Sequence, residues 1–157
     1  MEQLILRGLR YDDAKEAATV CRKCFGKHGA PRKNYLADIA PSWRHIYLVA
    51  ELAGKIVACM GARIAESYKD YNESEFDHAM IEVVAVDPDY HGQGIGTKLF
   101  AELLAAIDDK GIKFTALSVN PTNTPAIEFY EHFGFEYHGD IAKINEDIGT
   151  LFMFRKK

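Results

Sequence analysis

The chain has 157 residues, which fits one domain and leaves little room for two. Apolar residues make up 48% and charged residues 27%, so the chain can bury an ordinary core. The net charge of -4 argues against a general nucleic-acid-binding protein, and no apolar run approaches the roughly 20 residues that cross a bilayer. Residues 1–10 lack the apolar core and the cleavage site of a secretory signal, so we expect a cytoplasmic protein.

Hydrophobic periodicity and turn residues predict alternating strands and helices. The predicted strands cover residues 3–7, 46–51, 55–60, 80–86, 114–119, about 135–143 and 150–155. The predicted helices cover 11–25, about 33–40, 94–110 and 124–134. Gly26 ends the first helix, and the last has Thr124 as its N-cap and Pro125 at its first position. This order predicts a single mixed-sheet α/β domain over residues 1–157.

The cysteines and histidines predict no metal site. Cys21, Cys24 and Cys59 are an odd number in a chain without an export signal, so we expect reduced thiols. Cys21 and Cys24 form a CxxC pair inside a helical run, where packing is a more frequent role than redox or metal chemistry. The six histidines are scattered without zinc spacing.

A glycine-rich turn joins the strand at 80–86 to the helix at 94–110. Residues 91–96 read His-Gly-Gln-Gly-Ile-Gly. Glycines let a backbone approach a ligand closely, and the first turn of a helix presents unpaired N–H groups and a positive dipole end. Together these features predict a cradle for phosphate.

Two common phosphate motifs do not fit this turn. A Walker A loop needs Gly-Lys-Ser/Thr, whereas the order here is Gly96-Thr97-Lys98. A dinucleotide fingerprint needs GxGxxG, whereas Thr97 stands in place of its third glycine. A nucleotide-phosphate enzyme is therefore disfavoured, and a third candidate is the pyrophosphate loop of acyltransferases.

Two motifs resemble the GNAT superfamily of acetyl-CoA-dependent N-acyltransferases. The first is a strand ending in Val86-Asp87-Pro88, followed by Gly94-Ile95-Gly96; His91 departs from the usual Arg or Gln. A histidine can still donate to phosphate, but its charge depends on pH. The second motif lies one helix and one strand later. It consists of Asn123, Ala126, Tyr130, Gly134 and Phe135.

The resemblance implies a GNAT-type α/β (α+β) fold. This is a central mixed, mostly antiparallel twisted sheet of six to seven strands, flanked by about four helices and splayed between strands 4 and 5. It implies acetyl-CoA as co-substrate and no metal. The implied coenzyme-binding residues are Val84, Ala85, Val86, His91, Gly92, Gln93, Gly94, Ile95, Gly96, Thr97, Asn123 and Tyr130. Asn123 is alternatively a residue that starts a helix.

The resemblance also implies two catalytic groups. Tyr130 would protonate the departing thiolate, although it could instead be a core aromatic. Glu82, a lone carboxylate in an apolar strand on the face of Val84 and Val86, is the first candidate for the base. A surface glutamate is the equal alternative. His78, Asp77, His138 or a water chain are the reserves for the base.

The implied activity is transfer of acetyl from acetyl-CoA to a primary amine of a small molecule, peptide or protein, by direct attack in a ternary complex. The alternative is a non-catalytic acyl-CoA-binding regulatory module. The acidic residues 66–77 attract a cationic amine or form a solvated loop. We expect acceptor specificity in residues 11–43 and 141–150, and the oligomeric state stays open between monomer and homodimer. Aromatic candidates to line the cleft are Trp43, Tyr68, Tyr71 and Tyr137.

Overall fold

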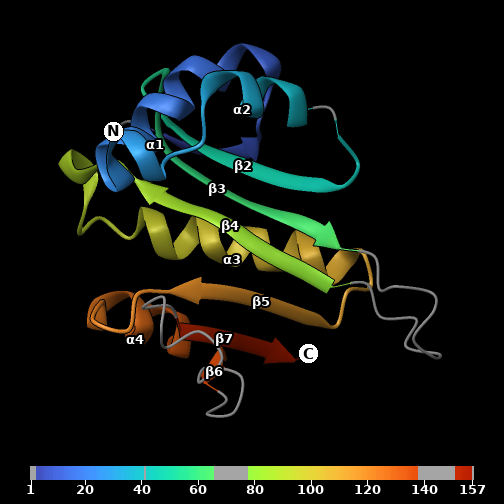
Figure 1. Ribbon diagram of the computed structural model, residues 1–157. Helices are drawn as coiled ribbons and strands as arrows, with labels where there is room; N and C mark the ends of the chain where they lie inside the picture. Colours follow the sequence, from blue (N-terminus) through green and yellow to red (C-terminus); the bar gives the residue numbers. More distant parts are fainter. Residues whose placement is uncertain (1–2, 41, 66–77, 138–150, 157) are drawn as a thin grey trace. The chain divides into compact units, whose positions relative to one another are not determined.

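The strands and helices follow the predicted order in the computed structural model, which describes residues 3–40, 42–65, 78–137 and 151–156 (Figure 1). The strands are β1 (Leu4–Gly8), β2 (His45–Leu52), β3 (Lys55–Ala65), β4 (His78–Val86), β5 (Phe114–Val119), β6 (Glu136–Tyr137) and β7 (Leu151–Lys156). The helices are α1 (Ala14–Gly29), α2 (Lys33–Ile39), α3 (Ile95–Asp109) and α4 (Thr124–His132), and short 3₁₀ helices cover Tyr11–Asp13 and Pro88–Tyr90.

The strands form one mixed sheet in the order β1-β2-β3-β4-β5-β7-β6. The ladders β1–β2, β2–β3, β5–β7 and β6–β7 are antiparallel, and β4–β5 is parallel. The parallel ladder pairs His78–Met80 with Phe114–Ala116, whereas β4 continues to Val86. The predicted mixed sheet with a splay after the start of β4 is therefore confirmed.

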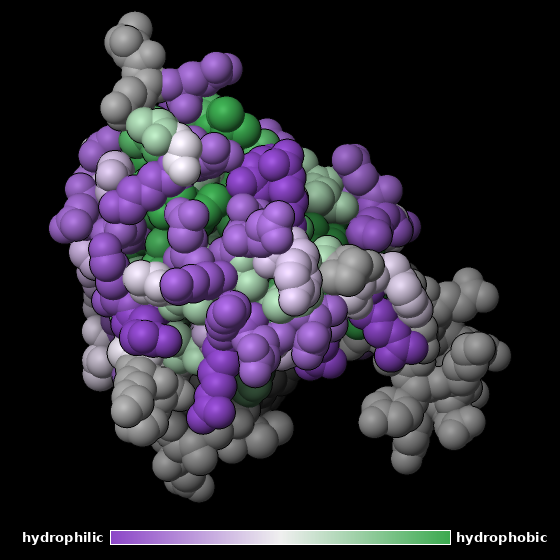
Figure 2. Space-filling model, turned by 90° about the horizontal axis from the view of Figure 1, so that it is seen from above, coloured by the Kyte–Doolittle hydropathy of each residue, from purple (hydrophilic) through white to green (hydrophobic). Residues whose placement is uncertain are grey.

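Residues 1–63 and 82–107 form a first compact unit. Its core joins α1 and α2 to β2, β3 and β4 through small and branched side chains, among them Ala17, Leu36, Val49 and Val83. The surface seen from above is mainly hydrophilic, with hydrophobic areas confined between polar ones (Figure 2). This is the pattern expected where each helix buries one apolar stripe.

Helix α3 is amphipathic, and its apolar residues are buried. They are Ile95, Leu99, Phe100, Leu103, Leu104 and Ile107. Among the described residues, no helix combines the length and the hydropathy that a bilayer span requires.

Residues 64–81 and 108–157 form the second compact unit. Strand β5 pairs along its whole length with β7, and Leu117 faces Met153 in the register. Both of these side chains are buried, as is Phe135 just after α4. Two hydrogen bonds of 3.1 and 2.9 Å join the Arg155 guanidinium to the carboxylate of Asp108.

Two predicted helix boundaries were wrong. The N-cap of α4 is Asn123, not Thr124, because the Asn123 side-chain oxygen accepts a hydrogen bond from the N–H of Ala126. Helix α1 continues past Gly26 to Gly29, with Gly26 in the left-handed region (φ 74°) at a kink. Of the strand predicted at 135–143, the described part is β6, and residues 138–143 lie outside the described residues.

An ion pair holds β1 to the start of α1. The Arg7 guanidinium donates at 2.6 and 2.9 Å to the carboxylate of Asp13, which is 8% exposed and also accepts from the N–H of Arg10 at 2.7 Å. The bond from Arg7 lowers the pKa of Asp13 although burial opposes the shift. A carboxyl whose folded pKa is lowered stabilises above its unfolded pKa of about 3.9, and the stabilisation is lost as the pH falls through the folded value.

We therefore predict that Asp13→Asn lowers the free energy of unfolding at pH 7 by about 1.5–3 kcal/mol, because it removes a charged hydrogen-bonding partner of Arg7. The deficit should shrink below pH 4, because the carboxyl of the unfolded wild-type chain then binds a proton that the folded chain takes up only at lower pH. Urea unfolding at pH 7 and pH 3 measures both values. Asp12→Asn, at the exposed neighbouring position, is the matched control. An equal deficit at both pH values would contradict the prediction.

Candidate active site

The end of β4 is fixed by buried polar contacts. The Asp87 N–H donates to the carbonyl of Val57 at 2.8 Å, and the Asp87 carboxylate, 1% exposed, accepts from Lys23 Nζ at 2.9 Å and from the Asp89 N–H at 3.0 Å. Burial alone would raise the pKa of Asp87, but the hydrogen bonds from Lys23 and the Asp89 N–H bring it below its ordinary value. The glycine turn therefore leaves β4 from a rigid, ionised anchor.

The glycine turn has the backbone that a phosphate cradle needs. Gly92 and Gly94 have φ values of 79° and 78°, a region that side chains with a Cβ rarely adopt. A Cβ on Gly96 would lie 3.3 Å from Val86 Cγ2, so only glycine packs there without a shift. The first bond of α3 runs from the Lys98 N–H to the Gly94 carbonyl at 3.1 Å, so the N–H groups of residues 95–97 have no acceptor within the helix.

His91 points back to the strand. Its Nε2 lies 2.8 Å from the carbonyl oxygen of Val86, and the Cys24 Sγ donates to the same oxygen at 3.1 Å. Burial raises the pKa of the Cys24 thiol, so the group stays a neutral donor. A carbonyl oxygen has two lone pairs, and both of those on Val86 are thus matched by donors.

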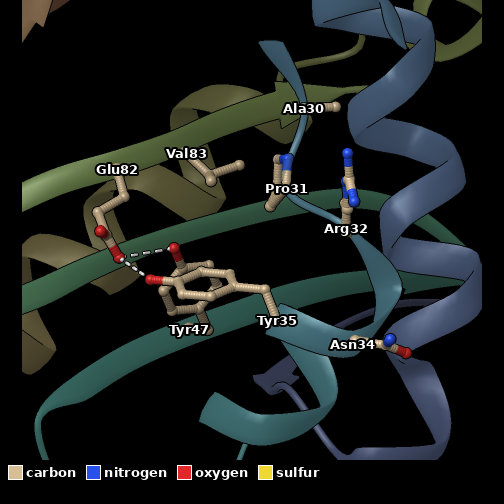
Figure 3. A pocket seen from close by; sticks show the side chains of 8 residues that line it. All are labelled: Ala30, Pro31, Arg32, Asn34, Tyr35, Tyr47, Glu82 and Val83. Carbon is tan, nitrogen blue, oxygen red and sulfur yellow. Dashed lines mark hydrogen bonds between the residues drawn. The ribbon is translucent and has the colours of Figure 1, made fainter. Parts of the chain in front are cut away.

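Glu82 is the centre of a hydrogen-bonded cluster. Its Oε1 accepts from the hydroxyls of Tyr35 and Tyr47, each at 2.9 Å (Figure 3), and Arg63 Nε lies 3.6 Å from its Oε2. The side chain of Glu82 is 24% exposed. Residues 82, 84 and 86 alternate with more deeply buried neighbours, so the predicted strand alternation is confirmed.

Glu82 lines a cavity of about 510 Å³ in the first unit. The wall combines polar groups with small apolar ones. It consists of Ala30, Pro31, Arg32, Asn34, Tyr35, Tyr47, Glu82 and Val83. A carboxylate at the wall of such a cavity can bind a cation or accept a proton from one.

Gly61 makes room for Tyr47. The two residues are partners in the β2–β3 register, and a Cβ on Gly61 would collide with the Tyr47 ring. We predict that Gly61→Ala displaces this ring, lowers the free energy of unfolding by about 1–3 kcal/mol and weakens the contact with Glu82. Gly8→Ala is the control, because a Cβ there meets nothing within 4 Å. Equal thermal melting temperatures for the two variants would contradict the prediction.

Tyr130 and Asn123 lie in the second unit, on α4 and at its N-cap. The Tyr130 ring packs edge-on against Phe129 and Phe135, at 5.5 and 6.0 Å between centroids. Burial raises the pKa of Tyr130 to about 12, so the phenol keeps its proton at neutral pH. Asn123 Oδ1 accepts from the Ala126 N–H at 3.3 Å, which accounts for the side-chain oxygen and leaves the amide nitrogen as the group that can reach a ligand.

Of the reserve residues for the base, only His78 lies within the described residues. The His78 ring packs against Phe114 at 5.7 Å in the second unit, and its Nδ1 is a buried atom without a hydrogen-bond partner in the described part of the chain. Asp77 and His138 lie outside the described residues, as do Tyr68, Tyr71 and the stretches 66–77 and 141–150.

Two of the predicted cleft aromatics, Trp43 and Tyr137, lie within the described residues. Trp43 is 64% exposed and carries the Arg44 guanidinium 5.0 Å above its ring. Tyr137 lines a second cavity, of about 400 Å³, with Phe135 and Met153. Within the described ranges, no group of three His, Cys, Asp or Glu side chains could hold a metal ion.

Sequence reasoning missed Tyr35, Tyr47 and Arg63 around Glu82. Tyr35 and Tyr47 are 47 and 35 residues from Glu82 in the chain, and no local motif links them. The only signal in the sequence was a tyrosine in a predicted strand and another in a predicted helix, each with a hydroxyl that can donate a hydrogen bond.

Comparisons with known proteins place the chain in a family. Residues 13–135 match the model of the acetyltransferase (GNAT) family. The ribosomal protein bS18-alanine N-acetyltransferase of Escherichia coli (strain K12) is 39% identical over 59 residues, which are 38% of this chain and 40% of that protein. The matched part of the chain thus spans only 40% of the length of this relative.

Solved structures show the same fold. The PaiA N-acetyltransferase of Thermoplasma acidophilum, in complex with coenzyme A, is 17% identical with a TM-score of 0.72, and the match covers 99% of both chains. The ribosomal-protein-S18-alanine N-acetyltransferase of Escherichia coli is 21% identical with a TM-score of 0.73, over 98% of this chain and 94% of that one. With the family model covering most of its length, the chain belongs to the acetyltransferase (GNAT) family.

Proposed function

We propose that this chain is an N-acetyltransferase that moves the acetyl group of acetyl-CoA to a primary amine of a small molecule, peptide or protein, and that residues 1–157 act as one catalytic domain. The observation that carries the proposal is the glycine turn at the start of α3. Its two left-handed glycines and the first-turn N–H groups of α3 fit a pyrophosphate. The family match supplies the identity of the coenzyme.

Backbone groups of β4 would hold the pantetheine arm. Val84 and Ala85 contribute N–H and C=O groups, and Val86 contributes its N–H, because its carbonyl already accepts from Cys24 and His91. A strand N–H aimed at the thioester carbonyl would stabilise the oxyanion as the amine attacks. Gly92 to Thr97 would bind the pyrophosphate, and Asn123 would reach the arm with its amide nitrogen.

Two side chains would move protons. Glu82 accepts a proton from the amine, and its position in the wall of a cavity supports this role. Tyr130 gives its hydroxyl hydrogen to the departing thiolate, and its raised pKa of about 12 keeps that hydrogen in place until it is needed. In the transfer one C–N bond forms and one C–S bond breaks, so no metal or redox group is required.

A thiol-release screen tests the proposal. Purified protein and acetyl-CoA are incubated with spermidine, kanamycin, lysine and a peptide with an N-terminal alanine. Because a relative of this chain is named for an alanine acceptor, the peptide is the first amine to try. Release of coenzyme A that depends on one amine supports the proposal. Tight binding of acetyl-CoA without release across the panel would instead support a non-catalytic binding module.

A further inference from the structure

We infer that Tyr35 and His45 form a proton relay in the first unit, which leads from the carboxylate of Glu82 to the hydroxyl of the half-buried Ser42. The inference rests on the proposed function, because it deepens the role of Glu82 as the base. Tyr35 and His45 are positioning residues in this scheme, because they act through Glu82.

The relay is a continuous set of side-chain contacts. The Tyr35 hydroxyl donates to Glu82 Oε1 at 2.9 Å, and the same hydroxyl lies 3.5 Å from His45 Nε2. The other ring nitrogen, His45 Nδ1, lies 3.0 Å from Ser42 Oγ. The step from Tyr35 to His45 is the longest, and such contacts often shorten once a substrate is bound.

The relay begins at a cavity and ends at half-buried residues. Glu82 and Tyr35 both line the cavity of about 510 Å³, and Tyr35 is 38% exposed. His45 and Ser42 are half-buried. A proton taken up by Glu82 in the cavity therefore has a route through side chains to Ser42.

The proton balance closes over the relay. The ammonium gives one proton to the Glu82 carboxylate. The resulting carboxylic acid donates to the Tyr35 oxygen while the Tyr35 hydroxyl hydrogen passes to His45 Nε2. The hydrogen on His45 Nδ1 then leaves through Ser42 to solvent, which leaves the neutral ring with its hydrogen on Nε2. Exchange of ring hydrogens with water restores the Nδ1–H tautomer before the next turnover. Glu82 is again a carboxylate, and one proton has moved from the amine to water.

Charged and aromatic residues lie around His45. Arg63 is its partner in the β2–β3 register. The Tyr35 ring lies edge-on at 6.1 Å and the Tyr47 ring is tilted at 6.2 Å. Glu82 is the negative charge that faces this cluster, and it is already shared with Arg63 at 3.6 Å.

Tyr47 offers a matched control within the same cluster. Its hydroxyl donates to the same oxygen of Glu82 at the same distance, 2.9 Å, as that of Tyr35. In the relay, only Tyr35 continues to His45. If the two tyrosines merely position Glu82, their substitution by phenylalanine should have equal effects, and His45 should be dispensable.

The test measures kcat of wild type, His45→Ala, Tyr35→Phe, Tyr47→Phe and the double variants, with the panel amine that gives the highest wild-type rate. In weakly buffered solution, His45→Ala and Tyr35→Phe should each lower kcat by roughly ten- to a hundredfold, the low end of what a positioned acid or base supplies. Added imidazole should restore His45→Ala in a saturable manner. In the double variant Tyr35→Phe/His45→Ala, kcat should fall no further than in either single variant.

The losses of kcat in Tyr47→Phe and His45→Ala should be additive in the double variant. His132→Ala, at an exposed position on α4, is the control: its kcat should equal that of the wild type, and added imidazole should not change it. If His45→Ala does not fold, the smaller change His45→Asn serves in its place. Wild-type kcat in folded His45→Ala, or equal losses in Tyr35→Phe and Tyr47→Phe, would overturn the relay while acetyl transfer stands. Absence of transfer in the wild type would overturn the proposed function and the relay together.

Discussion

Glu82→Gln is expected to lower kcat by about 10²–10⁴-fold while the affinity for acetyl-CoA changes little. Glutamine keeps the size of the side chain and can still accept from Tyr35 and Tyr47, but it cannot take a proton from the amine. The residual rate should rise with pH, because a larger fraction of the amine is then already neutral. Steady-state kinetics from pH 6 to pH 10 measures both effects.

Glu102→Gln, an exposed change on α3, is the control for Glu82→Gln and should leave the kinetics unchanged. If Glu82→Gln retains the wild-type kcat at neutral pH, the base is another group. His78 would then be the first alternative to test, because it is the reserve candidate that lies within the described residues.

Tyr130→Phe is expected to lower kcat by a comparable factor and to leave coenzyme binding nearly intact. The substitution removes one hydroxyl from a ring that otherwise keeps its packing against Phe129 and Phe135. The loss should fall on the step in which the thiolate departs, so an acetyl donor with a more acidic thiol should recover part of the rate.

The control for Tyr130→Phe is Tyr11→Phe, because Tyr11 is 71% exposed. Thermal melting shows whether the variant protein is still folded, and calorimetry with coenzyme A shows whether the arm still binds. Unchanged turnover in a folded Tyr130→Phe protein would show that the phenol is part of the hydrophobic packing only.

The sequence was most informative where local pattern and burial agree. Strand β5 was predicted with the bounds it has, because its apolar run is isolated between turn residues and buried through pairing with β7. The first turn of α4 was misread because Asn123 and Thr124 are both good N-caps, and only the hydrogen bond to the Ala126 N–H distinguishes them. Gly26 was read as a stop, whereas in α1 it produces a kink.

In the candidate site, too, local features could be predicted from the sequence and long-range contacts could not. The glycine turn could be predicted because each part of its chemistry is local: glycines, the helix start and the strand before it. The direction of His91 could not, because its ring turns back to the Val86 carbonyl and not outward. The contacts of Tyr35 and Tyr47 with Glu82 depend on how α2, β2 and β4 pack, and a single sequence carries little information about such long-range pairs.

The most direct measurement of acetyl transfer is the balance of products. The protein is incubated with acetyl-CoA and the best amine of the panel, free thiol is counted by a colorimetric reagent, and the amine is analysed by mass spectrometry. We predict one acetylated amine for each coenzyme A released, with both quantities reduced in Glu82→Gln and Tyr130→Phe. Bound acetyl-CoA without acetylated amine, or thiol release that does not depend on the amine, would contradict the assignment of this chain as an N-acetyltransferase.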